Sequence, residues 1–152
     1  MSPPGSGVVS RVLGVDLGTR RIGLALSDPL GITAGPLAVI ERSGDRAADH
    51  RAILEAGREA GATRIVVGLP LALSTGAAGP AARAVLDEVD ELSRRAALVG
   101  MAVETHDERL STVSAQAALA AGGVKARNRR GVVDKVAAAV ILQSWLDGQR
   151  SR

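Results

Sequence analysis

Large apolar residues follow one another closely between Arg11 and Leu17, in the segment RVLGVDL. Such a nearly continuous run is typical of a strand that is covered on both faces. The next segment, RIGLALS, alternates between large apolar and small residues, which predicts a second strand. Gly18 and Thr19 form a tight turn between the two strands, so we expect a hairpin.

The rest of the chain alternates short apolar runs with stretches of helical period. It predicts strands at 37–42, 64–69 and 101–105, and helices at 45–60, 81–98, 111–121 and 132–146. The order is typical of an α/β fold with a five-stranded mixed sheet flanked by about four helices. In this sheet three consecutive strands form a meander, and two further strands run parallel to the first.

The chain has 152 residues, which gives room for one domain, and we expect that domain to span residues 11–147. Residues 1–10, rich in Pro, Gly and Ser, are expected to form a mobile leader, and residues 148–152 a mobile tail. The small-residue stretch Leu71–Pro80 is expected to be a loop at the strand end that surrounds the ligand site in open α/β sheets, and the sequence leaves its role open.

Composition narrows the function classes. The chain is 46% hydrophobic but holds one aromatic residue, Trp145, which argues against binding bases on an aromatic platform. Lys and Arg number 19 against 16 Asp and Glu, and this balance allows a polyanionic partner without requiring one. The absence of cysteine excludes disulfides, a thiolate nucleophile and a cysteine zinc site. With no long apolar run and no signal-peptide pattern, we expect a soluble cytoplasmic protein without membrane contact.

Asp16 lies inside the apolar run of the first strand. Burying an ionised carboxylate without a partner costs several kcal/mol or more, so Asp16 needs a cation, hydrogen-bond donors or a raised pKa. Pairing with an arginine for structural reasons explains the residue as well as a functional role does.

Asp134 is a second acid in apolar surroundings. At about 100° per residue, Lys135, Gln143 and Asp147 fall on one side of the last helix, and Ala137, Ala138, Ile141 and Trp145 on the other. Asp134 lies on the apolar side. A first-turn acid is also stabilised by the helix N-terminus, by roughly 0.3–1 kcal/mol, so a structural role remains open.

A third candidate lies in the segment from His106 to Arg109, directly after the fifth strand and before a helix. Strand ends that face a helix start are where α/β folds place chemistry. Asp107 and Glu108 can hardly share one orientation, so one of them is expected to face the site, and the pattern does not choose between them. An acid before a helix is also a common cap, and His106 alone is better explained as a surface residue than as a ligand.

Three carboxylates from two strand regions and a helix can together hold one or two Mg²⁺ or Mn²⁺ ions. Such ions can activate a water for in-line attack on a phosphodiester. The set therefore favours a metal-dependent hydrolase over three unrelated structural acids.

Basic residues surround these acids in the sequence. Lys125, Arg127, Arg129 and Arg130 lie in a predicted basic loop, 124–131, where they could neutralise phosphates with strong salt dependence and little sequence choice, or form a solvated charge run. Arg21 could contact phosphate or pair with an acid, Arg109 could hold a phosphate or orient Glu108, and Arg20 is expected to be a surface residue.

Four sequence blocks in order resemble the YqgF (RuvX) family. They are VDLG with RIG within 15–23, VVGLP at 66–70, DERLST at 107–112, and Asp134 followed by an Ala-rich helix. Members of this family have a ribonuclease H-like fold and are described as pre-16S rRNA nucleases and also as Holliday junction resolvases. The resemblance runs from about Arg11 to Leu146, and the blocks are specific together although each alone is weak.

The resemblance implies a metal-dependent endonuclease whose acidic triad is Asp16, Glu108 and Asp134, with Mg²⁺ or Mn²⁺ as cofactor and nucleic acid as partner. It selects Glu108 over Asp107. It also implies cytoplasmic maturation of the 5′ end of the small-subunit rRNA, in ribosome biogenesis. One departure is that members often have an Asp-Gly pair in the loop after GLP, where this chain has Leu73-Ser74-Thr75-Gly76.

Three alternatives remain. A Holliday junction resolvase acting on branched DNA would need a homodimer with two sites related by a two-fold axis. Asp16-Leu17-Gly18-Thr19 also resembles the phosphate loop of actin-like and sugar-kinase ATPases, but those proteins close two such domains around the nucleotide, and this chain has the length for one. A non-catalytic RNA-binding assembly factor is disfavoured, because clustered acids would repel phosphates.

Overall fold

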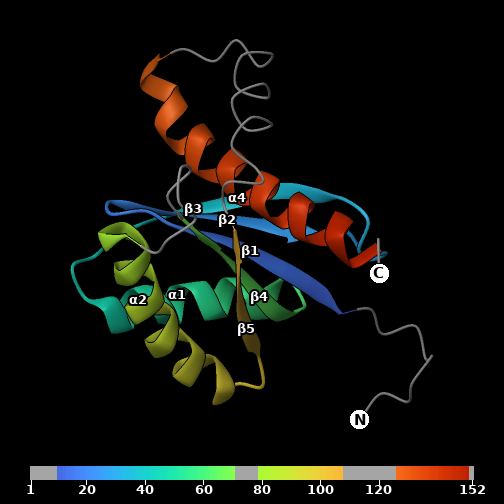
Figure 1. Ribbon diagram of the computed structural model, residues 1–152, viewed down its shortest axis with the longest axis horizontal. Helices are drawn as coiled ribbons and strands as arrows, with labels where there is room; N and C mark the ends of the chain where they lie inside the picture. Colours follow the sequence, from blue (N-terminus) through green and yellow to red (C-terminus); the bar gives the residue numbers. More distant parts are fainter. Residues whose placement is uncertain (1–9, 71–78, 108–125, 151–152) are drawn as a thin grey trace.

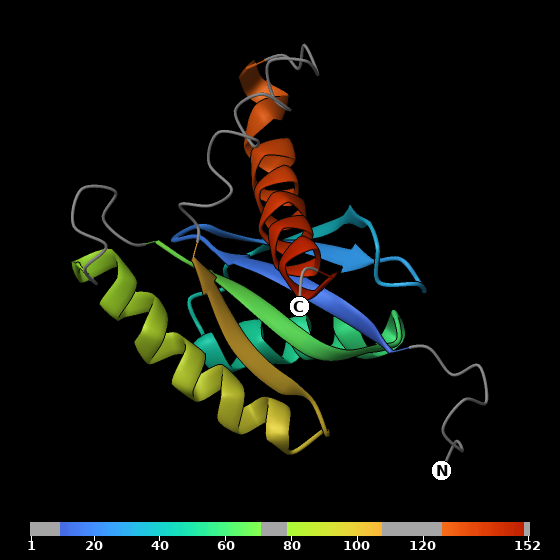
Figure 2. The ribbon, with the colours of Figure 1, turned by 45° about the vertical axis from the view of Figure 1, so that its right-hand side comes forward.

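The computed structural model describes residues 10–70, 79–107 and 126–150, without the side chains of 126–133. Five strands form one sheet, with helices on both of its faces (Figure 1). Helix α4 (Ala126–Arg150) crosses one face, while helices α1 (Arg46–Glu59) and α2 (Pro80–Ala97) cover the other, as Figure 2 shows from a second direction. None of the described helices is long and apolar enough to cross a membrane.

The sheet has the mixed topology expected from the sequence. Its strands are β1 (Arg11–Leu17), β2 (Arg21–Ser27), β3 (Ala34–Glu41), β4 (Ala62–Leu69) and β5 (Ala102–Asp107), in the spatial order β3-β2-β1-β4-β5. Strands β1, β2 and β3 form the antiparallel meander, and β4 and β5 run parallel to β1. The predicted α/β class and sheet are therefore confirmed.

Strand β1 lies at the centre of the sheet and is covered on both faces, as its apolar run predicts. Leu13, Val15 and Leu17 belong to the main core beneath α1 and α2, whereas Val12 packs against the smaller cluster beneath α4. The acid in this strand is therefore held by packing on both sides of the sheet.

Helices α1 and α2 begin and end close to the predicted positions. The Asp45 side chain caps α1 by accepting hydrogen bonds from the backbone N–H groups of Ala47 and Ala48. Gly61, at a φ of 82°, turns the chain from α1 into β4. Helix α2 starts at Pro80 and carries Arg94 and Arg95 in its last turn, as the helix dipole favours.

The boundaries of β3, β4 and β5 differ from the prediction, and β4 begins at Ala62 instead of Arg64. Strand β3 begins at Ala34 instead of Leu37, because it is an edge strand and its register shift beside Ala25 accommodates Pro36. Strand β5 extends to Asp107, so His106 and Asp107 lie within the strand and not after it. The helix predicted at 111–121 and residues 71–78 of the loop predicted at Leu71–Pro80 lie outside the described residues, and Pro80 is the first residue of α2.

Helix α4 is longer than predicted at both ends. It begins at Ala126, so Arg127, Arg129 and Arg130 lie on its first turns and the predicted basic loop is wrong for residues 126–131. Alanine and arginine are among the best helix formers, and one glycine costs a helix only about 1 kcal/mol relative to alanine. The helix also continues to Arg150, so residues 148–150 of the expected tail are helical.

Candidate functional site: an acid pair beneath helix α4

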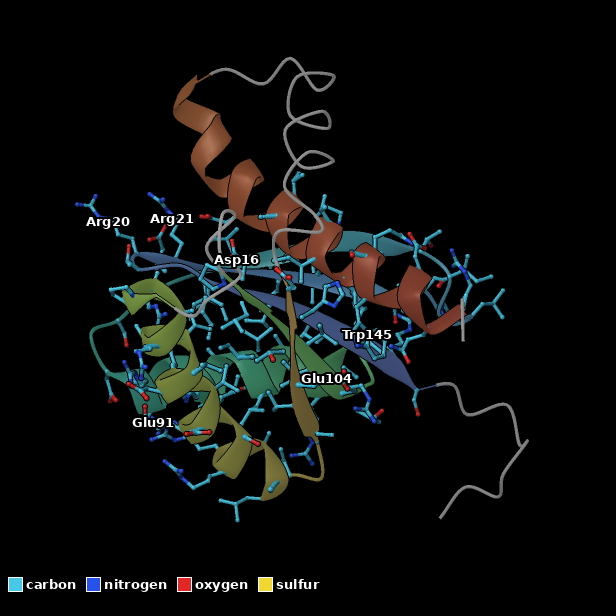
Figure 3. All side chains as sticks on the ribbon, viewed as in Figure 1. Asp16, Arg20, Arg21, Glu91, Glu104 and Trp145 are labelled. Carbon is cyan, nitrogen blue, oxygen red and sulfur yellow. The ribbon has the colours of Figure 1, made fainter. Side chains whose placement is uncertain are left out.

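Asp16 faces helix α4. Along β1, Val15 and Leu17 point into the core beneath α1 and α2, and side chains alternate between the faces of a strand. Asp16 therefore lies on the opposite face, where Figure 3 shows it beneath α4. Its side chain is half-buried.

Gly23 brings Asp134 next to Asp16. Gly23 is the cross-strand partner of Asp16, and a Cβ at Gly23 would lie 2.0 Å from the carbonyl oxygen of Asp134 and 2.5 Å from its carbonyl carbon. Directly opposed residues of an antiparallel pair share one face, with Cβ positions about 5 Å apart. The missing side chain of Gly23 therefore lets the backbone of α4 lie against the sheet beside Asp16.

Other small residues extend this close contact along α4. A Cβ at Gly14 would lie 2.7 Å from Cβ of Leu142 and 2.9 Å from the carbonyl oxygen of Ala138. Ala25, the cross-strand partner of Gly14, packs with Ala138 in the cluster beneath the helix. The position of Asp134 is thus fixed by packing that runs along the helix.

Asp134 carries an unsatisfied oxygen. Its side chain is 20% exposed, but Oδ2 is buried and accepts no hydrogen bond from any residue in the described part of the chain. The guanidinium of Arg21 approaches this oxygen, with Nη1 4.0 Å away. Burial raises the pKa of Asp134 above its ordinary value, and the positive charge of Arg21 offsets only part of this. Helical phase predicted this inward orientation correctly.

Arg21 lies between two acids. Its Nε donates a hydrogen bond of 3.1 Å to Glu41 Oε1, and its guanidinium approaches Asp134. Of the two sequence-based possibilities, pairing with an acid is therefore present in the structure. Arg20, beside it, projects away from the end of the sheet (Figure 3).

Strand β5 presents alternate residues to α4. Glu104 Oε1 accepts a hydrogen bond of 2.8 Å from Trp145 Nε1, and His106 Nε2 lies 2.9 Å from Ser144 Oγ. Burial lowers the pKa of His106, which favours its neutral form. Asp107, the next residue, falls on the other face by strand alternation, so it does not share the face of Asp16 and Asp134.

The described residues contain two of the three predicted acids. Glu108, Arg109 and Lys125 lie outside them, and the side chains of Arg127, Arg129 and Arg130 are not described. Within residues 10–70, 79–107 and 126–150, no three His, Asp or Glu side chains gather closely enough to hold a metal ion. The structure thus brings Asp16 and Asp134 together and does not place a third acid beside them.

The chemistry of this pair suits a divalent cation. The two acids lie on one face of the sheet, and a buried oxygen of Asp134 lacks a hydrogen-bond donor in the described residues. Hard divalent cations such as Mg²⁺ and Mn²⁺ select oxygen ligands of this kind. Asp16 and Asp134 therefore fit such an ion, and two carboxylates leave coordination positions that a further acid can fill.

A cleft of about 590 Å³ opens on the α1 and α2 side of the same strand ends. Asp16 and Gly18 line it together with Arg42, Arg46 and Glu88. Neither Arg42 nor Glu88 was among the site residues predicted from the sequence. Helical spacing could have shown that Glu88 is buried, because it lies four and eight residues before Leu92 and Ala96 and so shares an apolar helix face with them.

The chain is similar to one family of known proteins over nearly its whole length. A family model described as "RuvX: Holliday junction resolvase" matches residues 10–148. A protein of Mycobacterium ulcerans named "Putative pre-16S rRNA nuclease" is 45% identical over 149 residues, covering 97% of this chain and 84% of its own length. A protein of the same name from Anaeromyxobacter dehalogenans is 49% identical over 137 residues, covering 90% and 96%.

The fold is shared with a solved structure. RuvC of T. thermophilus, solved in complex with a Holliday junction substrate, superimposes with a TM-score of 0.59 at 17% identity, covering 93% of this chain and 96% of that one. The ribonuclease H-like fold expected from the sequence blocks is therefore confirmed.

Proposed function

The chain belongs to the RuvX family, a family of nucleases, and from this we propose that it is a metal-dependent endonuclease that hydrolyses phosphodiesters in structured nucleic acid. The observation that carries the proposal is the buried Oδ2 of Asp134, which lacks a donor in the described residues and lies on the same face of the sheet as Asp16. A protein built only for stability gains nothing from an unsatisfied buried oxygen, which costs about 1–3 kcal/mol.

Asp16, Glu108 and Asp134 are the residues that we expect to hold Mg²⁺ or Mn²⁺. The family resemblance selects Glu108 over Asp107, and the position of Asp107 agrees with this, because Glu104 and His106 face α4 and Asp107 therefore falls on the other face of β5. When bound, such an ion supplies positive charge at the scissile phosphate and a nucleophile at neutral pH.

The chain's own residues hold this site in position. Gly23 seats the backbone of Asp134 beside Asp16, and Arg21 limits the charge repulsion between the acids while the ion is absent. Arg127, Arg129 and Arg130, on the first turns of α4, belong to the same helix as Asp134, and we propose that they and Lys125 bind phosphates beside the scissile bond. We assign the same role to Arg109.

The substrate that we favour is precursor 16S rRNA, cleaved at its 5′ side, because the similar curated proteins carry a name for that activity. Resolution of Holliday junctions is the second candidate. It is favoured by the description of the family model, and it requires two copies of the site related by a two-fold axis.

Cleavage assays on both substrates test the proposal. Purified protein is incubated with precursor rRNA and with a four-way DNA junction, in Mn²⁺ or in a chelator, alongside Asp16→Asn and the control Asp147→Asn, which changes an exposed acid of α4. We expect rRNA cleavage in Mn²⁺ that is lost in the chelator and in Asp16→Asn but kept in Asp147→Asn. Cleavage that survives the chelator or Asp16→Asn contradicts the mechanism, and preferential cleavage of the junction selects the second candidate.

A further inference from the structure

Arg42 holds the turn between β1 and β2 at two points. The residue follows the last residue of β3, and its backbone N–H donates a hydrogen bond of 2.9 Å to the carbonyl oxygen of Arg20. Its side-chain Nε donates a second hydrogen bond of 2.9 Å to the carbonyl oxygen of Gly18. One residue therefore binds both ends of the three-residue segment that joins the strands.

A buried ion pair fixes the other end of the Arg42 side chain. Nη1 and Nη2 donate hydrogen bonds of 2.7 and 2.9 Å to the two carboxylate oxygens of Glu88, which is buried on α2. Burial raises the pKa of Glu88, but the hydrogen bonds from Arg42 and His50 outweigh it and hold the pKa below its ordinary value. Glu88 is therefore ionised, and the bidentate geometry leaves the guanidinium one orientation.

His50 continues this chain into α1 and back to α2. Arg95 Nη1 lies 2.8 Å from His50 Nδ1, and because a guanidinium can only donate, Nδ1 is the acceptor. The proton of the neutral ring is then on Nε2, which donates to Glu88 Oε2 over 2.8 Å. His50 is fully buried, so the whole chain from Arg95 to Arg42 is held in place by the packing of the two helices.

The segment held by Arg42 joins the parts of the proposed site. Gly18 donates its N–H to the carbonyl oxygen of Asp16 over 3.1 Å, so Arg42 acts on Asp16 through one residue. Arg20, the other contact, directly precedes Arg21, whose guanidinium approaches Asp134. A Cβ at Gly18 would lie 2.5 Å from the carbonyl oxygen of Arg21, which shows how tightly the segment is folded.

We infer that Arg42 is a positioning residue, which fixes Asp16 and Arg21 relative to Asp134 through the Gly18 and Arg20 carbonyls and thereby sets the affinity of the acid pair for a divalent cation. The cation part of this inference rests on the proposed function. The hold on the β1–β2 turn does not, since it is defined by hydrogen bonds within the chain.

The test uses two conservative substitutions. Arg42→Lys keeps a positive charge opposite Glu88 but lacks the Nε–H that reaches Gly18. Arg46→Lys is the matched control, because Arg46 lines the same cleft and likewise pairs with an acid of α2, through a 2.5 Å contact with Glu91, but makes no hydrogen bond to the β1–β2 turn within the described part of the chain.

The double variant Arg42→Gln with Glu88→Gln removes both charges of the bidentate pair and repeats the measurement without an unpaired Glu88. Asp49, whose Oδ2 lies 3.9 Å from Arg42 Nη1, keeps its hydrogen bonds from Ser43.

Two quantities are measured on the full chain: the amide hydrogen exchange of Gly18 and Arg21, and the dissociation constant for Mn²⁺ by calorimetry. For Arg42→Lys and for the double variant we expect exchange of these amides at least about tenfold faster, and Mn²⁺ affinity about 10- to 100-fold weaker, as is usual when an outer support of a metal ligand is removed. Arg46→Lys should change neither beyond about twofold.

Exchange and affinity in Arg42→Lys that match those in Arg46→Lys overturn the inference. A wild-type protein that binds no Mn²⁺ contradicts the proposed function instead, and in that case the exchange rates alone decide whether Arg42 holds the turn.

Discussion

Replacing Asp134 by asparagine is predicted to stabilise the metal-free protein. The buried Oδ2 of Asp134 accepts no hydrogen bond from the described residues, and burial outweighs Arg21 in raising its pKa. An asparagine fits the same space without the charge, and its carbonyl oxygen can face Arg21. We expect a gain of about 1 kcal/mol in the free energy of unfolding at pH 7, because the variant no longer buries a carboxylate charge that Arg21 only partly offsets. The gain stays at the lower end of ~1–3 kcal/mol because one polar atom of the asparagine amide still lacks a partner.

Bound cation should reverse this order. A ligand at about 100 times its dissociation constant stabilises the folded state by about 2.7 kcal/mol, and Asp134→Asn loses a ligand oxygen and most of this gain. For a domain of this size, 1 kcal/mol shifts the melting temperature by roughly 2–4 °C, which thermal or urea unfolding resolves. The variant should therefore unfold at a higher temperature than wild type in a chelator and at a lower temperature in Mn²⁺.

The direction of the pKa shift gives this prediction a pH dependence. Because the pKa of Asp134 is raised in the folded state, its contribution to stability is fully present below the ordinary value of 3.8 and is lost as the pH rises through the folded value. The advantage of the variant should thus be largest near neutral pH and shrink toward about pH 4. Asp147→Asn, which changes an exposed acid of the same helix, is the control and should show no such crossover. A destabilised Asp134→Asn in the chelator, or equal Mn²⁺ stabilisation of both proteins, refutes the reasoning.

Three further predictions concern other parts of the molecule. Gly23→Ala forces a Cβ against the backbone of Asp134, so it should lower the free energy of unfolding by at least about 1–3 kcal/mol and weaken Mn²⁺ binding. In the control Gly35→Ala the new Cβ meets nothing within 4 Å, and neither quantity should change. Equal unfolding curves for the two variants would refute the close approach of α4 to the sheet. The pKa of Glu88 is lowered in the folded state, so its stabilising contribution is present above the ordinary value of 4.5 and is lost as the pH falls through the folded value. Urea unfolding should show that Glu88→Gln destabilises the protein by about 3–5 kcal/mol at pH 7 and by much less near pH 3. A difference that does not change with pH argues against an ionised pair. The double variant Arg129→Ala with Arg130→Ala should reduce the slope of log nucleic-acid affinity against log salt concentration by about 1 for each phosphate that it no longer neutralises. An unchanged slope would show that these arginines do not bind phosphate.

The sequence was most informative where local pattern and packing agree. The apolar run around Asp16 predicted a covered strand, and helical phase placed Asp134 on the inner face of α4, because each residue is surrounded by several neighbours that share its environment. Helical phase also indicates burial at two other polar residues: Glu88 shares an apolar helix face with Leu92, and His50 shares one with Ile53. Their partners are 38 to 46 residues distant in the chain, so pattern alone could not pair them with each other or with Arg42.

Boundaries failed where tertiary contacts override local preference. One glycine and four basic residues made 124–131 resemble a loop, but its arginines and Ala126 are strong helix formers, and the helix runs through Gly131. At β5, pairing of Gly68 with His106 and of Leu69 with Asp107 extends the strand beyond the apolar residues that predicted it. The role of Gly23 was equally hidden, because it arises from a helix backbone that lies about a hundred residues later in the chain.

The most direct test of the account is to locate the metal ion itself. Crystals of the wild-type protein soaked in Mn²⁺ are expected to show an anomalous difference peak between the carboxylates of Asp16, Glu108 and Asp134, at about 2.1 Å from their oxygens, and the peak should be lost in Asp134→Asn. A protein that shows no peak beside Asp16 and Asp134 at saturating Mn²⁺, or the same peak in wild type and Asp134→Asn, contradicts the claim that these acids form a metal site.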